Sequence, residues 1–231
     1  MSAAGTRARV RAELTREIAE VARTHLASDG AAALSLRAVA RELGMASSAV
    51  YRYFPSRDEL LTALIIDAYN ALGEAAEQAD AALARDDLRG RWRAVCTTIR
   101  TWAVTRPHEY ALVYGSPVPG YAAPEATIEP ASRVDLVLAG ILADGVRTGA
   151  VDARSDGSGA DAALSPGLAA MIDLPDDPTG SVAARAVYAW SSLFGLLTFE
   201  LFGHAHNVVA DHEALFADAV ERIGTQAGLP T

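Results

Sequence analysis

The side chains best suited to bind another molecule are the arginines of the first 57 residues. This segment holds nine arginines against five acidic residues, whereas residues 58–231 hold eleven against 24. A small basic part therefore precedes a large acidic part, a difference that the net charge of −9 conceals. Guanidinium groups pair well with phosphates, so the asymmetry suggests a polyanion as the partner of the basic part. An ordinary fluctuation in composition would also explain it.

Three small residues in the basic part have the spacing of a helix-turn-helix. Ala40, Gly44 and Val50 occupy its fifth, ninth and fifteenth places. The second helix crosses over Ala40, Gly44 supplies the positive φ of a tight turn, and Val50 fills the angle between the helices. Such a pair reads the major groove of DNA through its second helix. An unrelated helical hairpin would also accommodate this spacing.

Helices must position these residues, and the sequence predicts helices along the whole chain, with no alternating strand pattern. We predict a first helix that ends at Asp29 and further helices over about 36–43, 47–53, 57–84, 88–105, 107–114, 130–148, 164–172, 181–202 and 210–226. Ser56 and Glu59 form a capping box at the start of the fourth helix, the one predicted over 57–84. Residues 115–127 are rich in proline and glycine and are expected to be a loop. Residues 150–162 are rich in glycine, serine and aspartate and are expected to be mobile.

A longer run of residues surrounds the helix-turn-helix. It comprises Gly30, Leu34-Ser35-Leu36-Arg37, Val39-Ala40, Gly44 and VYRYFPSRDELL over residues 50–61. This run, within about residues 14–61, closely resembles the TetR family of bacterial regulators. The resemblance implies an all-helical homodimer. Its N-terminal lobe would bind operator DNA, and its C-terminal lobe would bind a small effector and dimerise.

The resemblance also assigns candidate DNA contacts. It implies that Ser35 caps a helix and touches a phosphate, and that Arg37 reaches a phosphate or a guanine edge. Arg57 stands where the family usually has a lysine, at a helix N-terminus that favours phosphate. Ala46 replaces the usual capping serine or threonine of the recognition helix, which costs about 1 kcal/mol unless Ser47 caps instead. The full candidate set is Ser35, Arg37, Ser47, Ser48, Ala49, Tyr51, Arg52, Tyr53 and Arg57.

Two stretches of the C-terminal part, WSSLFGLLTFELFGH over residues 190–204 and RPHEY over residues 106–110, resemble the WHG-type C-terminal domain of TetR regulators. This resemblance implies that the last two helices pack across a dimer. Residues 187–199 are apolar nearly all round, so the helix must be covered on several faces. A membrane span is the alternative, but the longest charge-free run here is 14 residues, against the roughly 20 that a span needs.

Aromatic side chains predict a ligand pocket in the C-terminal lobe. Tyrosine and tryptophan suit a flat or amphiphilic ligand, although plain core packing explains each of them as well. The candidate lining is Tyr69, Trp92, Cys96, Trp102, Tyr110, Tyr114, Trp190 and Phe194. Cys96 is also explained as an inert core residue or as a redox sensor. The loop at 115–127 and the segment at 150–162 are candidate access routes for the ligand.

Catalytic and metal-binding patterns are missing from the sequence. There is no G-x-S-x-G, H-E-x-x-H, Walker or G-x-G-x-x-G motif, so we predict neither an enzyme nor a bound cofactor. His204, His206 and His212 have no Asp, Glu or Cys at a suitable local spacing, so we predict no metal site. A single cysteine excludes a disulfide scaffold, and the N-terminus lacks the apolar segment of a secretory signal.

We therefore predict an all-α cytoplasmic protein with no membrane segment. Residues 1–56 would form a helix-turn-helix DNA-binding domain and residues 57–231 an effector-binding and dimerisation domain, with the spatial boundary inside the fourth helix. The expected function is that of a transcriptional repressor, a homodimer through its last two helices, which a small-molecule effector releases from a pseudo-palindromic operator. The alternatives are an activator or architectural DNA-binding protein of the same fold, and a ligand-binding protein with a vestigial DNA lobe.

Overall fold

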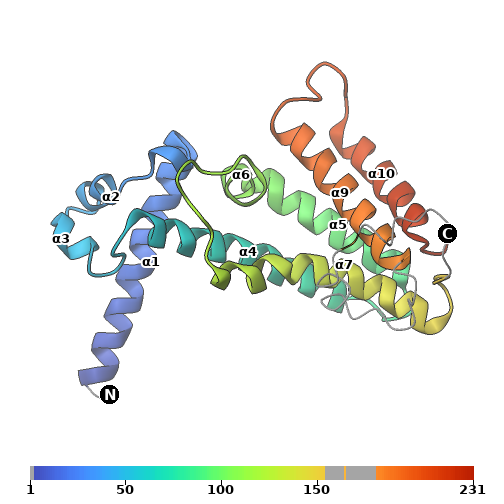
Figure 1. Ribbon diagram of the computed structural model, residues 1–231, viewed down its shortest axis with the longest axis horizontal. Coiled ribbons are helices and arrows are strands. Elements are labelled where there is room, and N and C mark those ends of the chain that lie inside the picture. Colours follow the sequence, from blue (N-terminus) through green and yellow to red (C-terminus); the bar gives the residue numbers. More distant parts are fainter. Residues whose placement is uncertain (1–2, 154–163, 165–180) are drawn as a thin grey trace. The chain divides into compact units, whose positions relative to one another are not determined.

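A computed structural model of the chain describes residues 3–153, 164 and 181–231. Within these ranges every regular element is a helix, which confirms the all-α class (Figure 1). In chain order they are α1 (Ala3–Asp29), η1 (Ala31–Ala33), α2 (Leu36–Glu42), α3 (Ser47–Val50), α4 (Arg57–Ala81), α5 (Leu88–Thr105), α6 (Pro107–Tyr114), η2 (Glu125–Thr127), α7 (Ile128–Thr148), α9 (Ser181–Leu201) and α10 (His212–Ala227), where η marks a 3₁₀ helix.

Some elements differ from their predicted form. Helix α3 ends at Val50, and backbone hydrogen bonds continue its winding only as turns to Phe54. The predicted loop at 115–127 ends in the short helix η2. The predicted helix at 164–172 and the predicted mobile segment at 150–162 lie largely outside the described residues.

The chain forms two compact units. The N-terminal unit consists of Met1–Tyr69 and Arg106–Ile128, and the C-terminal unit consists of Asn70–Thr105 and Glu129–Thr231. The division in space therefore falls inside α4. Helix α6 and the loop that follows it belong to the unit that carries the helix-turn-helix, although α5 and α7 on either side belong to the other unit.

An apolar core between α1, α2, α3 and the first turns of α4 holds the N-terminal unit together. Ile18, Val39 and Val50 are fully buried in it, as their helical spacing predicts. The backbone N–H of Glu59 donates to the Ser56 hydroxyl at 3.1 Å, so Ser56 caps α4 as expected. Helix α6 packs on α1 within the same unit.

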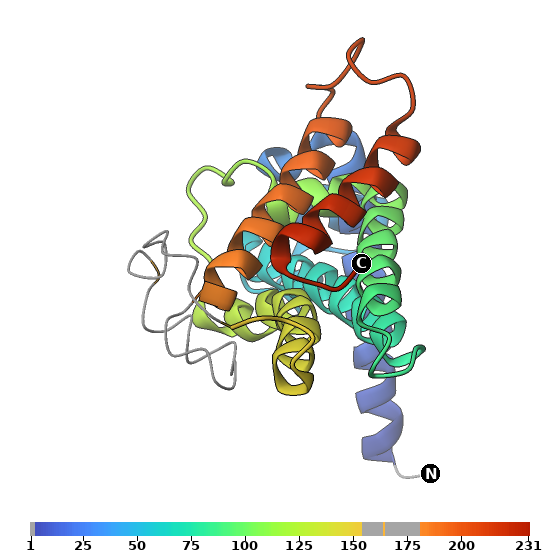
Figure 2. The same ribbon diagram turned by 90° about the vertical axis from the view of Figure 1, so that its right-hand side faces the viewer.

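In the C-terminal unit α5, α9 and α10 pack against one another, and α9 and α10 run side by side (Figure 2). The indole N–H of Trp92 on α5 donates to the backbone oxygen of Val220 on α10 at 2.9 Å. Gly224 permits this approach, because a Cβ there would lie 3.0 Å from the Trp92 indole nitrogen. Arg100 on α5 and Glu200 on α9 form an ion pair with two hydrogen bonds, of 2.7 and 3.1 Å.

A buried arginine joins three helices of the C-terminal unit. Arg91 on α5 is fully buried, and its guanidinium binds Asp80 on α4 and Asp144 on α7, each at 2.8 Å. A further bond of 2.9 Å reaches the backbone oxygen of Arg85. Burial would raise the pKa of Asp144, but hydrogen bonds from Arg147 and Arg91 outweigh it and hold that pKa below its usual range.

Helix α9 has 21 residues, so the length argument against a membrane span, based on a charge-free run of 14, does not hold for the helix itself. The core helix of a soluble protein passes the same test of length and composition. The charged residues of α9 have partners within the protein: Arg185 donates to the backbone oxygen of Asp152, and Glu200 binds Arg100. Packing against α5 and α10 therefore accounts for the apolar residues on one side of α9, whereas Tyr188 and Phe199 on the helix remain exposed.

Candidate nucleic-acid interface

The connection between α2 and α3 has the geometry of a helix-turn-helix. Gly44 has a φ of +64°, the left-handed conformation that its place in the motif predicts. The backbone N–H of Met45 donates to the oxygen of Ala40 at 2.9 Å and closes the turn. Val50 is fully buried and Ala40 nearly so. The spacing of the small residues therefore predicts this turn correctly.

The start of α3 presents small side chains. Ala46 is its N-cap residue and no side-chain hydrogen bond caps the helix, so the loss of the usual cap is confirmed. Ser48 is exposed, and Ser47 and Ala49 are half-buried. Methyl groups and hydroxyls are therefore what this end of α3 offers to a base edge, directly or through water.

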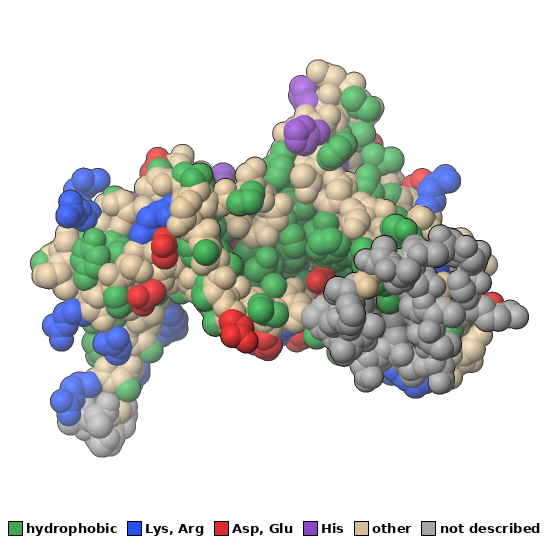
Figure 3. All heavy atoms as spheres, viewed as in Figure 1, with side chains coloured by type: hydrophobic (Ala, Val, Ile, Leu, Met, Phe, Trp, Pro, Cys, Tyr) green, Lys and Arg blue, Asp and Glu red, His purple; other side chains and the backbone are tan. Residues whose placement is uncertain are grey.

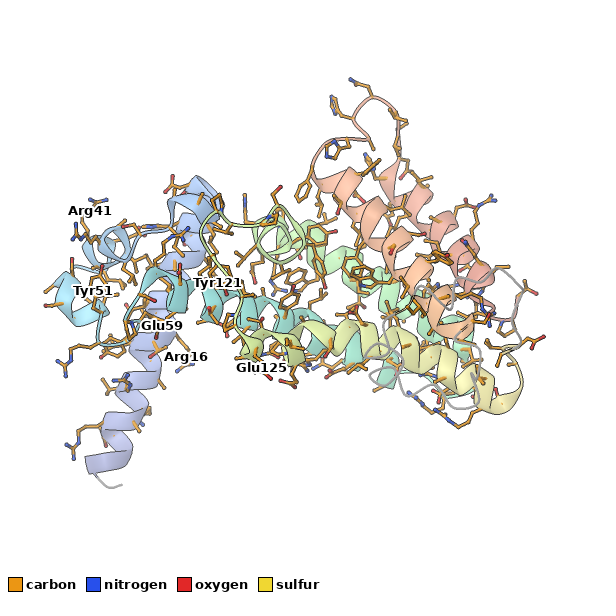
Figure 4. All side chains as sticks on the ribbon, in the orientation of Figure 1. Arg16, Arg41, Tyr51, Glu59, Tyr121 and Glu125 are labelled. Atoms are coloured by element: carbon orange, nitrogen blue, oxygen red, sulfur yellow. The ribbon has the colours of Figure 1, made fainter. Side chains whose placement is uncertain are left out.

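Two arginines on α2 belong to the same surface. Arg37 and Arg41 are exposed and four residues apart, hence on one side of the helix. Neither has an ion-pair partner within the described ranges. Figure 3 shows arginine side chains around the end of the N-terminal unit that carries α1 to α3, and Figure 4 shows Arg41 and Tyr51 at its outer side. Sequence reasoning missed Arg41, although its spacing from Arg37 could have revealed it.

Ser35 and the residues after α3 complete the surface. Ser35 is the N-cap residue of α2, as predicted, but its hydroxyl does not make the capping hydrogen bond. Tyr51 and Arg52 are exposed, and Tyr53 is half-buried against the core of the unit. Arg11 of α1 donates to the backbone oxygen of Arg52 at 3.3 Å, and its guanidinium lies 5.2 Å from the centre of the Tyr53 ring.

Arg57 has partners that sequence reasoning did not foresee. Its guanidinium donates to the backbone oxygens of Ala31 at 2.8 Å, Leu34 at 3.2 Å and Ala32 at 3.3 Å, and lies 3.4 Å from the carboxylate of Asp58. The side chain thus fastens η1, which leads into α2, to the start of α4. The phosphate contact assigned to Arg57 stays a prediction, and it would require the side chain to leave these carbonyls.

Replacing Arg57 separates its two possible roles. A phosphate contact needs only the charge, whereas the three carbonyls need the fork of N–H groups that lysine lacks. We expect Arg57→Lys to lower the free energy of unfolding by about 1–2 kcal/mol and to weaken DNA binding severalfold, close to the effect of Arg57→Ala. Thermal unfolding and fluorescence anisotropy with a DNA duplex measure both. A lysine variant as stable and as DNA-competent as the wild type would support the phosphate role instead.

The candidates for the effector pocket are divided between the two units. Tyr69, Tyr110 and Tyr114 lie in the N-terminal unit. The rings of Tyr69 and Tyr114 meet edge to face at 5.9 Å, and those of Tyr110 and Tyr114 lie 5.1 Å apart. The Tyr69 hydroxyl donates to the backbone oxygen of Val113 at 3.1 Å, so the protein itself uses this polar group.

Three candidates on α5 are buried in the C-terminal unit. Trp92, Cys96 and Trp102 are at most 3% exposed. Burial raises the pKa of the Cys96 thiol, which keeps it protonated and unreactive. The inert core interpretation of Cys96 is therefore favoured over the redox sensor.

The remaining two candidates lie together on α9, beside a carboxyl group. The rings of Trp190 and Phe194 are 5.5 Å apart. The Trp190 side chain also interacts with the carboxyl group of Asp135 of α7. Burial raises the pKa of Asp135 to about 6, and the interaction with Trp190 offsets only part of that shift. Sequence reasoning missed Asp135. No motif identifies this residue, because it comes close to the Trp190 indole only in the folded protein.

Two family models cover most of the chain. The model described as bacterial regulatory proteins of the tetR family matches residues 18–64, and that of the tetracyclin repressor-like C-terminal domain matches residues 92–223. The HTH-type transcriptional regulator Rv1816 of Mycobacterium tuberculosis is 38% identical, over 95% of this chain and 94% of that protein. The chain belongs to the TetR family. The resemblance carried by the helix-turn-helix is thereby confirmed.

Solved structures agree with the TetR assignment. The regulatory protein SCO4313 superposes with a TM-score of 0.76 at 34% identity, over 93% of this chain and 97% of that one. The TetR-family regulator PfmR from Thermus thermophilus shares the fold, with a TM-score of 0.60 at 19% identity over 93% and 99% of the two chains. As a TetR-family member, this protein is a DNA-binding transcriptional regulator.

Proposed function

We propose that the protein is a homodimeric, cytoplasmic repressor that leaves a pseudo-palindromic operator when a small molecule binds. DNA recognition would rest on residues 1–56, and effector binding and dimerisation on residues 57–231. The observation that carries the proposal is the exposed surface of α2 and α3. There Arg37 and Arg41 stand without ion-pair partners within the described residues, beside a helix start that presents only small groups.

The proposed DNA contacts divide into two kinds. The start of α3 enters the major groove, where its hydroxyl and methyl groups meet base edges. Arginine and tyrosine side chains around it hold phosphates and set the register. The contact residues are Ser35, Arg37, Arg41, Ser47, Ser48, Ala49, Tyr51, Arg52 and Tyr53, with Arg57 as a phosphate contact if it leaves its carbonyl partners.

The dimer would form through an exposed apolar stripe on α9 and α10. Tyr188, Phe199 and Leu215 are 51%, 57% and 41% exposed. Between α9 and α10 lies an open groove of about 410 Å³, lined by Ser191, Ser192, Gly195, Leu196, Phe199, Ala219, Arg222 and Ile223. A Cβ at Gly195 would meet nothing within 4 Å, so a partner helix can approach closely there. A second copy offers the same stripe, as a two-fold contact requires.

The effector would be an apolar or aromatic small molecule bound by the C-terminal domain. Trp190, Phe194 and Asp135 supply aromatic faces and one carboxyl group in a single part of the C-terminal unit. The molecule must bind more tightly to the state that cannot bind DNA. If 99% of the protein is in the DNA-binding state, reversing this ratio requires about 5.5 kcal/mol of difference in affinity between the two states. Screening aromatic compounds for release of bound DNA tests this proposal. If compounds that bind this protein leave its DNA affinity unchanged, effector release is wrong.

Arg37 provides the test of the DNA-binding surface. Fragments selected from genomic DNA give the operator and its symmetry, and fluorescence anisotropy then gives the affinity across a range of salt concentrations. Arg37→Ala is expected to weaken operator binding about tenfold and to lower the salt dependence by about one phosphate contact per protomer. It should also relax sequence preference at one position of each half-site. Arg93→Ala, a loss of one exposed arginine in the C-terminal unit, is the control and should change neither quantity.

An activator and an architectural protein of the same fold would make the same DNA contacts. A reporter gene placed behind the selected operator separates them from a repressor. We expect deletion of the regulator to raise expression, and lower expression after deletion would favour an activator. The third alternative, a vestigial DNA lobe, would be supported if selection returned no enriched fragment.

A further inference from the structure

Helix α1 begins well before the core of its unit. Residues 5–13 are all exposed, and the first fully buried residue is Ile18. Three arginines lie in this exposed segment, Arg7, Arg9 and Arg11, against the single acid Glu13. We call residues 3–13 the basic arm. Figure 1 shows it as the start of α1, extending beyond α2 and α3 of the same unit.

The arm gains little stability from its own unit. A helical segment as short as residues 3–13 is marginally stable in water unless packing supports it, and no residue from 5 to 13 is buried. Arg9 and Glu13 form only a long ion pair of 3.7 Å, with both side chains more than half exposed. Such a pair contributes little. The charge of the arm points to a polyanion as the partner that would hold it.

Arg11 ties the arm to the DNA-binding surface. Its bond to the backbone oxygen of Arg52 and its place over the Tyr53 ring hold one turn of the arm beside the residues that follow α3. Arg7 lies four residues earlier, hence on the same side of the helix as Arg11. The basic arm therefore lies next to the proposed interface within the same unit.

We propose that the basic arm binds the phosphate backbone of duplex DNA that flanks each operator half-site. The inference rests on the proposed function, since it extends the same interface. Charge complementarity and continuity with α3 both favour DNA as the partner. The eight residues that precede Arg11 span about 12 Å as a helix, which corresponds to roughly three to four base pairs. The arm thus enlarges the contacted site without reading its sequence.

The test compares two DNA lengths. One duplex ends at the edge of the selected operator, and the other continues for about six base pairs on both sides. We expect Arg7→Gln/Arg9→Gln to weaken binding to the long duplex about tenfold near 150 mM salt and to reduce its salt dependence by about two to four ions per dimer. Binding to the short duplex should not change. Arg11 is left intact because it also packs on Tyr53.

Controls separate the arm from the rest of the interface. Arg93→Gln, a charge loss in the C-terminal unit, should leave both affinities unchanged. Thermal unfolding of the double variant should match that of the wild type, because both replaced side chains are exposed. Equal affinities of wild type and double variant for the long duplex would overturn the proposed role of the basic arm. An equal loss of affinity for both duplexes would overturn it as well. If the wild type bound neither duplex, the proposed function itself would fail.

Discussion

Replacement of Arg91 by methionine is expected to lower the free energy of unfolding by about 3 kcal/mol, at the lower end of the range for breaking a buried ion pair. Methionine fills similar space but leaves the carboxylates of Asp80 and Asp144 without their buried guanidinium partner. Arg85 and Arg147 still bind these carboxylates, which limits the loss. For a chain of this size the melting temperature should fall by roughly 6–12 °C.

Arg93→Met is the matched control for Arg91. It makes the same substitution in α5, but Arg93 is largely exposed and pairs with Glu221 at the surface, so its effect should be small. Both variants must be compared at one protein concentration, because the proposed dimer would contribute to the melting temperature. A melting temperature of Arg91→Met within 2 °C of the control would show that the network contributes little to stability.

The Arg91 effect should also depend on pH. The pKa of Asp144 lies below its usual range in the folded protein. The contribution of this carboxylate to the free energy of unfolding is therefore complete above the unfolded pKa, near 3.9. The contribution is lost as the pH falls through the lowered folded pKa. The difference in stability between wild type and Arg91→Met should therefore be constant around neutral pH and shrink below about pH 4. Chemical unfolding at a series of pH values measures it.

Phe199→Asp is expected to lower operator affinity by at least about 100-fold, because two half-sites bound by one dimer gain that much over independent monomers. Phe199 is the most exposed aromatic residue of the α9–α10 stripe, and a carboxylate there would be buried unpaired in the proposed dimer. Light scattering after size exclusion should show a monomer, while circular dichroism should remain that of a folded helical protein.

Two further variants sharpen the dimer test. Leu83→Asp places the same charge on an exposed apolar residue of the α4–α5 connection and should leave the dimer intact. Gly195→Trp fills the groove between α9 and α10 and should also produce monomers, because the partner helix could no longer approach. A Phe199→Asp protein that remained dimeric and bound operator normally would show that the dimer forms elsewhere.

Local signals in the sequence predict most of the helices and the helix-turn-helix. The turn depends on residues close together in the chain, since Gly44 needs only its own φ and Val50 needs only to reach the two helices beside it. Helix boundaries follow in the same way from local signals, such as the serine cap of α4 and Pro107 in the first turn of α6. The family assignment followed because these local signals have a specific spacing.

Contacts between side chains that are distant in the sequence follow from the packing of the helices. Arg57 contacts a carbonyl 26 residues away, Arg91 a carboxylate 53 residues away, and no local pattern links either pair. The predicted pocket lining is divided between two units because α6, with Tyr110 and Tyr114, joins the unit of the helix-turn-helix, whereas Trp92 stays in the other. Side-chain partners of this kind depend on how the helices pack. A packing interface brings together residues from distant segments, and the order of these segments in the chain does not show which of them will be neighbours.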